Sequence, residues 1–102
     1  MWGDITQPGL VSKATQRKLK GNINHVFHMA AVYDLHMDDQ TGDRVNIEGT
    51  RNVVDFVNSL GGNVMLQHTS SVVVAGGHYN GVFEESMYDE GQDTSHPYFR
   101  TK

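Results

Sequence analysis

The feature that most constrains the fold is a long amphipathic segment placed between two short apolar ones. Four apolar residues spaced i, i+3, i+4 and i+7 predict a helix over about residues 43–60 that packs against a core. Thr41 or Asp43 is a suitable N-cap, and Gly61-Gly62 is a typical end for such a helix. The apolar stripe consists of Val53, Phe56, Val57 and Leu60.

Apolar runs of strand length lie on both sides of this helix, at residues 23–32 and 63–71, and Val72–Val74 is expected to extend the second one. A strand, helix, strand order predicts an α/β fold with a parallel sheet covered by helices. Ligands of such sheets bind at the carboxyl ends of the strands. Both expected ends, Ala30-Ala31 and Ser70-Ser71, carry small or hydroxyl side chains that leave room for a ligand.

Shorter segments complete the expected order of elements. Residues 2–5 could close a strand, and Ser12 can cap a short surface helix over about residues 13–20. The polar segment 33–42 reads as a loop with a helical turn. Residues 76–97 form a long polar loop, a type that is often functional, and Pro97 is placed to begin another helix.

Composition narrows the classes of protein. The chain has 102 residues, enough for one small domain, and a net charge of −4, which argues against a general nucleic-acid binder. It contains no apolar run long enough to span a bilayer, no start typical of a signal peptide, and no cysteine. We therefore expect a cytoplasmic protein with no nucleic-acid partner and no transmembrane segment, and the oligomeric state is left open.

The final residues contain a pair with catalytic potential. Tyr98 and Lys102 are four apart and fall on one face of a helix. An ammonium group beside a phenol favours the phenolate, which makes a tyrosine usable as a proton donor and acceptor near neutral pH. Such pairs are common on helices, so the pair has meaning only together with the residues that precede it.

Four motifs stand out along the chain: His28-Met29-Ala30-Ala31, Asn46-Ile47-Glu48-Gly49-Thr50, Thr69-Ser70-Ser71 with Gly76, and Tyr98-x-x-x-Lys102. Together they resemble the extended short-chain dehydrogenase/reductase family over nearly the whole chain. The stretches AAVYDL, NIEGTRNVVDF, SSVVVAG, GVF to DEG, and HPYFRTK look, more narrowly, like the fatty acyl-CoA reductase or thioester-reductase branch. The resemblance implies an NAD(P)-dependent reductase with a Rossmann-type doubly wound parallel sheet. It also implies NAD or NADP as cofactor, with NADPH slightly favoured, and an acyl thioester or aldehyde as the small-molecule substrate.

The resemblance also implies catalytic roles for four residues. Ser71, five before Gly76, matches the serine that hydrogen-bonds the substrate oxygen. Tyr98 matches the general acid/base, and Lys102 matches the lysine that makes this tyrosine more acidic and contacts the nicotinamide ribose. Asn46 matches the helix asparagine that holds a water molecule in the proton relay.

Further cofactor contacts are implied at the strand ends. Asp4 matches an acidic residue near the adenine, and Ile5 offers backbone and apolar contact there. Ala30 and Ala31 match small residues that let the cofactor lie against the strand end, and Ser70 supports Ser71. Tyr98 and Lys102 are also expected to contact the cofactor.

One departure from the family shapes the expected domain organisation. The family begins with a Gly-rich turn of the GxxGxxG kind, and none of the eleven glycines forms that pattern. We therefore expect residues 1–102 to be an internal part of an NAD(P)-binding Rossmann domain, lacking the first βαβ unit and the C-terminal substrate domain. With few strands to bury apolar surface, the isolated chain is expected to be marginally stable.

Alternative interpretations remain for the chain and for single motifs. A sugar-nucleotide epimerase or dehydratase, or a hydroxysteroid dehydrogenase, would share Ser71, Tyr98 and Lys102, and an inactive fragment is a third possibility. The hydroxyls of Ser70 and Ser71 could simply end a strand. His25 and His28 alternate with apolar residues, so no metal site is expected, and the missing G-x-S-x-G elbow disfavours a hydrolase.

Overall fold

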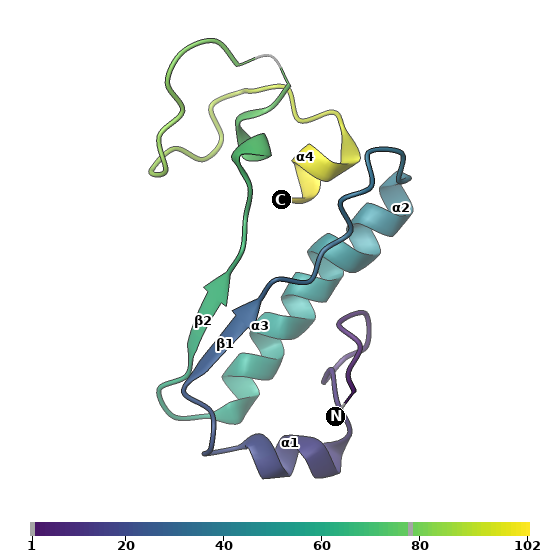
Figure 1. Cartoon of the computed structure of the whole chain (residues 1–102), viewed down its shortest axis with the longest axis vertical. Coiled ribbons are helices and arrows are strands. Elements are labelled where there is room, and N and C mark those ends of the chain that lie inside the picture. Colours follow the sequence, from purple (N-terminus) through teal and green to yellow (C-terminus); the bar gives the residue numbers. More distant parts are fainter. Residues whose placement is uncertain (1, 78) are drawn as a thin grey trace.

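The computed structural model describes residues 2–77 and 79–102. His78, which falls in the predicted long loop, lies outside the described residues, as does Met1. The molecule is elongated, with principal extents of 48 × 28 × 17 Å, and a long helix runs along most of it (Figure 1).

The long helix is continuous but changes its geometry along its length. It begins as α2 (Asp39–Gly42), continues as a π-helical segment η1 (Asp43–Glu48), and becomes α3 (Gly49–Leu60). The predicted cap at Thr41 or Asp43 is wrong, because Asp38 Oδ1 accepts from the Thr41 N–H at 2.7 Å and the helix begins earlier. The helical turn expected before residue 43 is confirmed as α2.

The predicted apolar stripe is confirmed as the core. In the described residues, the buried hydrophobic side chains are those of α3 that the i, i+3, i+4, i+7 spacing selected: Val53, Phe56, Val57 and Leu60. Gly61, with φ of +68°, ends the helix in a conformation that favours glycine.

The two predicted strands are present and parallel, but both are shorter than expected. β1 (His25–His28) pairs with β2 (Met65–His68), so that His28 lies opposite His68. Helix α3 covers one face of this pair (Figure 1). The result is a Rossmann-like α/β unit, while the complete doubly wound sheet stays a prediction.

Two expectations about the ends of the strands are wrong. Val72–Val74 does not extend β2, because Ser71 Oγ accepts from the Val73 N–H and starts a 3₁₀ helix, η2 (Val72–Ala75). Residues 2–5 form part of a turn instead of a strand, and the Asp4 N–H donates to Leu10 O at 2.9 Å.

The remaining helices are short. Ser12 caps α1 (Lys13–Leu19) by accepting from the Thr15 N–H, as predicted, and α4 (Pro97–Thr101) begins at the predicted proline. Between η2 and α4 the described parts of the long loop carry no helix or strand. Within residues 2–77 and 79–102, every helix falls short of the length and apolar character needed to cross a membrane.

Candidate active site at the carboxyl ends of the strands

Both strands point toward the end of the molecule that contains α4 and the long loop (Figure 1). The ladder continues one step past the strands, where the Thr69 N–H donates to His28 O at 3.0 Å. The next residues along the chain are Ser70 and Ser71, which the sequence assigned to the site. The carboxyl edge of the sheet therefore faces the helix that carries Tyr98 and Lys102.

Lys102 connects α4 to this edge. Its Nζ donates to Thr69 O at 3.0 Å, and Ser70 Oγ donates to the Lys102 carbonyl at 3.4 Å. The structure thus brings together two predicted site residues that are 32 positions apart in the sequence. An ammonium group has three donors, so the bond to Thr69 leaves further donors for another acceptor.

Ser71 lies at the start of η2 and beside a groove. Its hydroxyl accepts from the Val73 N–H at 3.4 Å. This bond satisfies a backbone group at the end of the strand, as the simpler alternative for Ser71 predicted. The same serine lines a groove together with Ser70, five apolar side chains and two carboxylates. The apolar residues are Val72, Val74, Ala75, Phe83 and Met87, and the carboxylates are those of Glu84 and Glu85. The groove therefore combines hydroxyl groups at the strand end with a mainly apolar lining and two acidic side chains.

The long loop is closed on itself near this groove. The Gly77 N–H donates to Asp93 O at 3.0 Å, and Gln92 Nε2 donates to Val74 O at 2.8 Å. Gly76 has φ of +82°, and a Cβ there would lie 2.5 Å from Asp93 O. The glycine five residues after Ser71 is thus required by both its backbone conformation and the close approach of the loop.

Asn46 is buried behind α4. Its Oδ1 accepts from the Val32 N–H at 2.8 Å, and its Nδ2 donates to Val32 O at 3.0 Å and to Thr101 Oγ1 at 2.9 Å. Both amide hydrogens are therefore committed to the chain itself. Asn46 joins the segment after β1 to α4, and its role in a proton relay stays a prediction.

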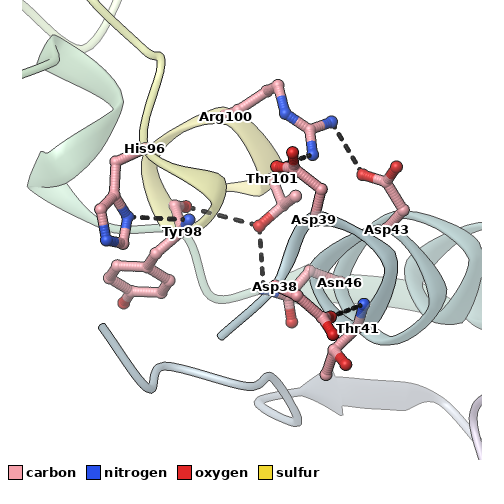
Figure 2. A network of polar contacts seen from close by, with 9 residues as sticks. All are labelled: Asp38, Asp39, Thr41, Asp43, Asn46, His96, Tyr98, Arg100 and Thr101. Atoms are coloured by element: carbon pink, nitrogen blue, oxygen red, sulfur yellow. Dashed lines mark hydrogen bonds and ion pairs between the residues drawn. The ribbon is translucent and has the colours of Figure 1, made fainter. Parts of the chain in front are cut away.

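Arg100 provides a second attachment of α4 to the long helix. Its guanidinium lies between two carboxylates, 3.2 Å from Asp39 Oδ1 and 2.7 Å from Asp43 Oδ1 (Figure 2). The hydrogen bond with Asp43 raises the pKa of Arg100 above its ordinary value. Since Arg100 is partly exposed, we expect these ion pairs to orient α4 more than to stabilise it.

Tyr98 and Lys102 have different neighbours in this structure. The Tyr98 ring lies 6.5 Å from the Phe99 ring, between centroids, and the Tyr98 backbone N–H donates to His96 Nδ1 at 3.1 Å (Figure 2). The Lys102 ammonium group instead contacts Thr69 at the strand end. A direct contact between the phenol and the ammonium group stays a prediction.

Asp4 and Ile5 lie against the long helix. Asn52 Nδ2 donates to Ile5 O at 2.8 Å, and a Cβ on Gly49 would lie 2.9 Å from Ile5 Cδ1. The Asp4 carboxylate accepts from the Thr6 hydroxyl and N–H, which lowers the pKa of Asp4. The turn is therefore held against α3 through Gly49 and Asn52, and a cofactor contact of Asp4 or Ile5 stays a prediction.

Ala30 and Ala31 follow β1 as predicted, in the segment that leads to Val32. Ala30 is exposed and Ala31 is half-buried. Because Asn46 holds the Val32 backbone at both its N–H and its C=O, this segment has a defined path past the strand end.

A pair of imidazoles at the strand ends was missed by the sequence analysis. His28 is 4% exposed, its Nε2 lies 2.9 Å from Thr50 Oγ1, and its ring centroid lies 5.3 Å from that of His68. Burial, with a smaller contribution from Lys102, lowers the pKa of both rings, and His68 also lowers that of His28. Because residues i and i+2 of a strand lie on the same face, the sequence could have predicted that both imidazole rings face the helix.

Comparison with known proteins identifies the family. The profile of an NAD-binding family described as "Male sterility protein" matches residues 1–102. The chain belongs to this male sterility protein family. A relative from Drosophila melanogaster, named "Putative fatty acyl-CoA reductase CG8306", is 32% identical over 92 residues. The match covers 89% of this chain and 17% of the relative, and no solved structure gives a significant match.

The match supports the extended short-chain dehydrogenase/reductase resemblance and the nicotinamide class of cofactor for the male sterility protein domain. The residues at the strand ends fit the nicotinamide and ribose end of such a cofactor. Lys102 has donors to spare, Ser71 offers a hydroxyl, and Ala30 adds no bulk beyond its Cβ. The pyrophosphate end is different, since no GxxGxxG turn occurs among the glycines of this sequence.

Proposed function

We propose that this chain contributes the catalytic strand ends of an NADPH-dependent reductase that acts on acyl thioesters or the derived aldehydes. The observation that carries the proposal is the contact of Lys102 Nζ with Thr69 O, next to Ser70 and Ser71. This contact places an ammonium donor and hydroxyl groups at the sheet edge where ligands of parallel sheets bind. The family match over residues 1–102 and the name of the Drosophila relative support the same class of reaction.

Each residue has a distinct task in the proposed reaction. When bound, the nicotinamide cofactor supplies a hydride, and negative charge grows on the oxygen of the carbonyl that accepts it. The Ser71 hydroxyl donates a hydrogen bond to that oxygen, and the Tyr98 phenol delivers the proton. The Lys102 ammonium group, which keeps donors beyond its bond to Thr69 O, would hold the nicotinamide ribose.

The lining of the groove supports an extended apolar substrate. Five apolar residues and two glutamates lie beside Ser70 and Ser71 in one groove: Val72, Val74, Ala75, Phe83, Met87, Glu84 and Glu85. A ligand pocket of this kind is lined mainly by apolar side chains, with a few polar groups that fix orientation. An aliphatic chain attached to a reducible carbonyl would match both parts of the groove.

A substitution at Tyr98 tests the proposal. In the protein that contains this chain, we expect Tyr98→Phe to lower kcat by about 10²–10⁴-fold, because it removes the proton donor. NADPH oxidation with an acyl-CoA measures the rate, and NADPH fluorescence measures binding, which should change by less than about threefold because the ring remains. Tyr33→Phe, at an exposed tyrosine after β1, is the matched control and should keep full activity.

The outcomes separate the candidate functions. Full activity of Tyr98→Phe would remove the role assigned to Tyr98 and with it the reductase proposal. Turnover of a sugar nucleotide or a hydroxysteroid in place of acyl-CoA would favour another branch of the same fold. NADPH binding without turnover of any of these substrates would favour the third alternative, a fragment with no catalytic activity.

A further inference from the structure

Helix α4, which carries Tyr98 and ends next to Lys102, cannot hold its own position. α4 has five residues, and isolated helices shorter than about 12–15 residues are marginal in water. Its orientation at the sheet edge must therefore come from contacts at its ends and sides. Arg100 and Thr101 supply contacts along the helix, and His96 supplies the contact at its start.

His96 makes two hydrogen bonds to backbone groups on different segments. Its Nδ1 accepts from the Tyr98 N–H at 3.1 Å, and its Nε2 lies 2.9 Å from Leu35 O, in the loop that follows β1. A backbone N–H only donates and a carbonyl only accepts, so both bonds form together in the neutral tautomer with hydrogen on Nε2. Both ring nitrogens are then occupied.

This arrangement does more than cap a helix. The usual caps, Ser, Thr, Asp and Asn, satisfy an N–H at the first turn with one short side chain. The imidazole of His96 also reaches a carbonyl 61 positions away in the sequence and packs on Phe99, with ring centroids 5.0 Å apart. It therefore acts as a rigid spacer between the Leu35 segment and the first turn of α4.

We infer that His96 is a positioning residue, which sets the start of α4 and so the placement of Tyr98 in its first turn. We call the two hydrogen bonds of His96, to the Tyr98 N–H and to Leu35 O, the tether. The tether does not depend on the proposed function. Its consequence for turnover rests on the proposed reductase function. Figure 2 shows the His96 ring facing the backbone nitrogen of Tyr98 at the start of α4.

Nuclear magnetic resonance of the chain tests the tether directly. ¹⁵N shifts of the neutral His96 ring should show hydrogen on Nε2 and none on Nδ1, where the Tyr98 N–H donates. In His96→Ala, exchange of the Tyr98 amide hydrogen should accelerate by about fivefold, as expected for the loss of a typical cap. His36→Ala is the matched control, because His36 follows Leu35 in the loop after β1 and its side chain is 96% exposed. This substitution should leave the exchange of the Tyr98 amide hydrogen unchanged.

A second variant separates the spacer from the cap. His96→Asn keeps a cap acceptor for Tyr98 but is too short to bridge to Leu35. In the reductase assay we expect His96→Asn to lower kcat by about tenfold per folded molecule, with the KM for NADPH changed by less than about twofold. A purely structural role for His96 would lower the yield of folded protein and leave kcat unchanged.

The possible failures are distinguishable. Hydrogen on Nδ1, or unchanged Tyr98 exchange in His96→Ala, overturns the tether. An unchanged kcat in His96→Asn, in a protein where Tyr98→Phe is inactive, overturns the positioning role. If Tyr98→Phe is itself fully active, the proposed function fails, while the tether is still decided by the tautomer and the exchange rate. Should His96→Ala not fold, the tautomer of the unmodified chain and the His96→Asn variant decide the question.

Discussion

His28 and His68 end neighbouring strands and are held together by the parallel register, with Lys102 close enough to lower the pKa of both imidazoles. Burial is the larger cause for each ring. The edge of the sheet is therefore arranged to hold neutral imidazoles beside one ammonium group. Protonation of His28 or His68 is therefore opposed first by burial and then by the neighbouring positive charges.

The stability of the chain should fall in mild acid because of these rings. The folded pKa values lie below the ordinary 6.5, so below pH 6.5 the unfolded chain binds more protons than the folded chain. The stabilising contribution is complete above about pH 6.5 and is lost as the pH falls through the lowered folded values. Urea unfolding between pH 5 and pH 8 measures this slope.

Substitution identifies the source of the slope. His28→Gln keeps a hydrogen-bonding group near Thr50 without a titration, and the pH dependence should become weaker. His25→Gln, on the exposed face of the same strand, should leave it unchanged. If the free energy of unfolding changes with pH equally in His28→Gln and in the unmodified chain, His28 is not the source of the pH dependence.

Among the elements, the π-helical segment η1 has the greatest structural influence. Its six residues carry Asn46, which bonds to Val32 on one side and to Thr101 on the other. π-helical turns within longer helices are rare and occur often at functional sites. Gly42, just before η1, lies close to α4, since a Cβ there would lie 3.4 Å from Thr101 Cγ2.

Removal of the Asn46 amide should loosen the attachment of α4 and the Val32 segment together. In Asn46→Ala the backbone groups of Val32 lose their partner in a buried place, and we expect a loss of about 1–3 kcal/mol in the free energy of unfolding. Exchange of the Val32 amide hydrogen should accelerate as well. Thermal unfolding and hydrogen exchange provide the two measurements.

Asn58→Ala is the matched control for helix propensity. Asn58 is exposed on α3, so both variants replace a helical asparagine by alanine. We expect the control to change stability by less than about 0.5 kcal/mol. Equal effects at the two positions would show that the buried bonds of Asn46 contribute nothing beyond propensity.

The whole molecule exposes more surface than a compact domain of its size. Its accessible area is 7414 Å², whereas a compact monomer of 11.4 kDa exposes about 5,800 Å². Part of the excess lies on the face of the sheet opposite α3, where Phe27 is 68% exposed and Met65 is 55% exposed. The chain by itself therefore leaves one side of its sheet uncovered.

Dye binding and hydrogen exchange should report this open face. We expect the chain of 102 residues to bind the dye anilinonaphthalene sulfonate, and the double substitution Phe27→Thr with Met65→Thr to reduce that binding by more than half. Val54→Thr, at an exposed position of α3, should have little effect. Amides across residues 64–66 should show weak protection, and strong protection in a monomer would contradict marginal stability.

Several features could be predicted from the sequence because they depend on residues close together in the chain. The stripe of α3, the two strands, the Ser12 cap and the start of α4 at Pro97 follow from period, cap and turn chemistry. The motifs also predicted which family the chain belongs to. The wrong expectations, a helix cap at Thr41 or Asp43 and a strand over Val72–Val74, concern element ends, where one side-chain hydrogen bond decides the outcome.

The contacts that assemble the site were decided by the tertiary structure. Asn46 meets Thr101, Lys102 meets Thr69, and His96 meets Leu35 across separations of 55, 33 and 61 positions. No local pattern encodes such pairs, because each needs two elements to pack before the polar groups come within bonding distance. The sequence alone determined which elements form and which groups could do chemistry, and the packing of α4 against the sheet edge decided which of those groups meet.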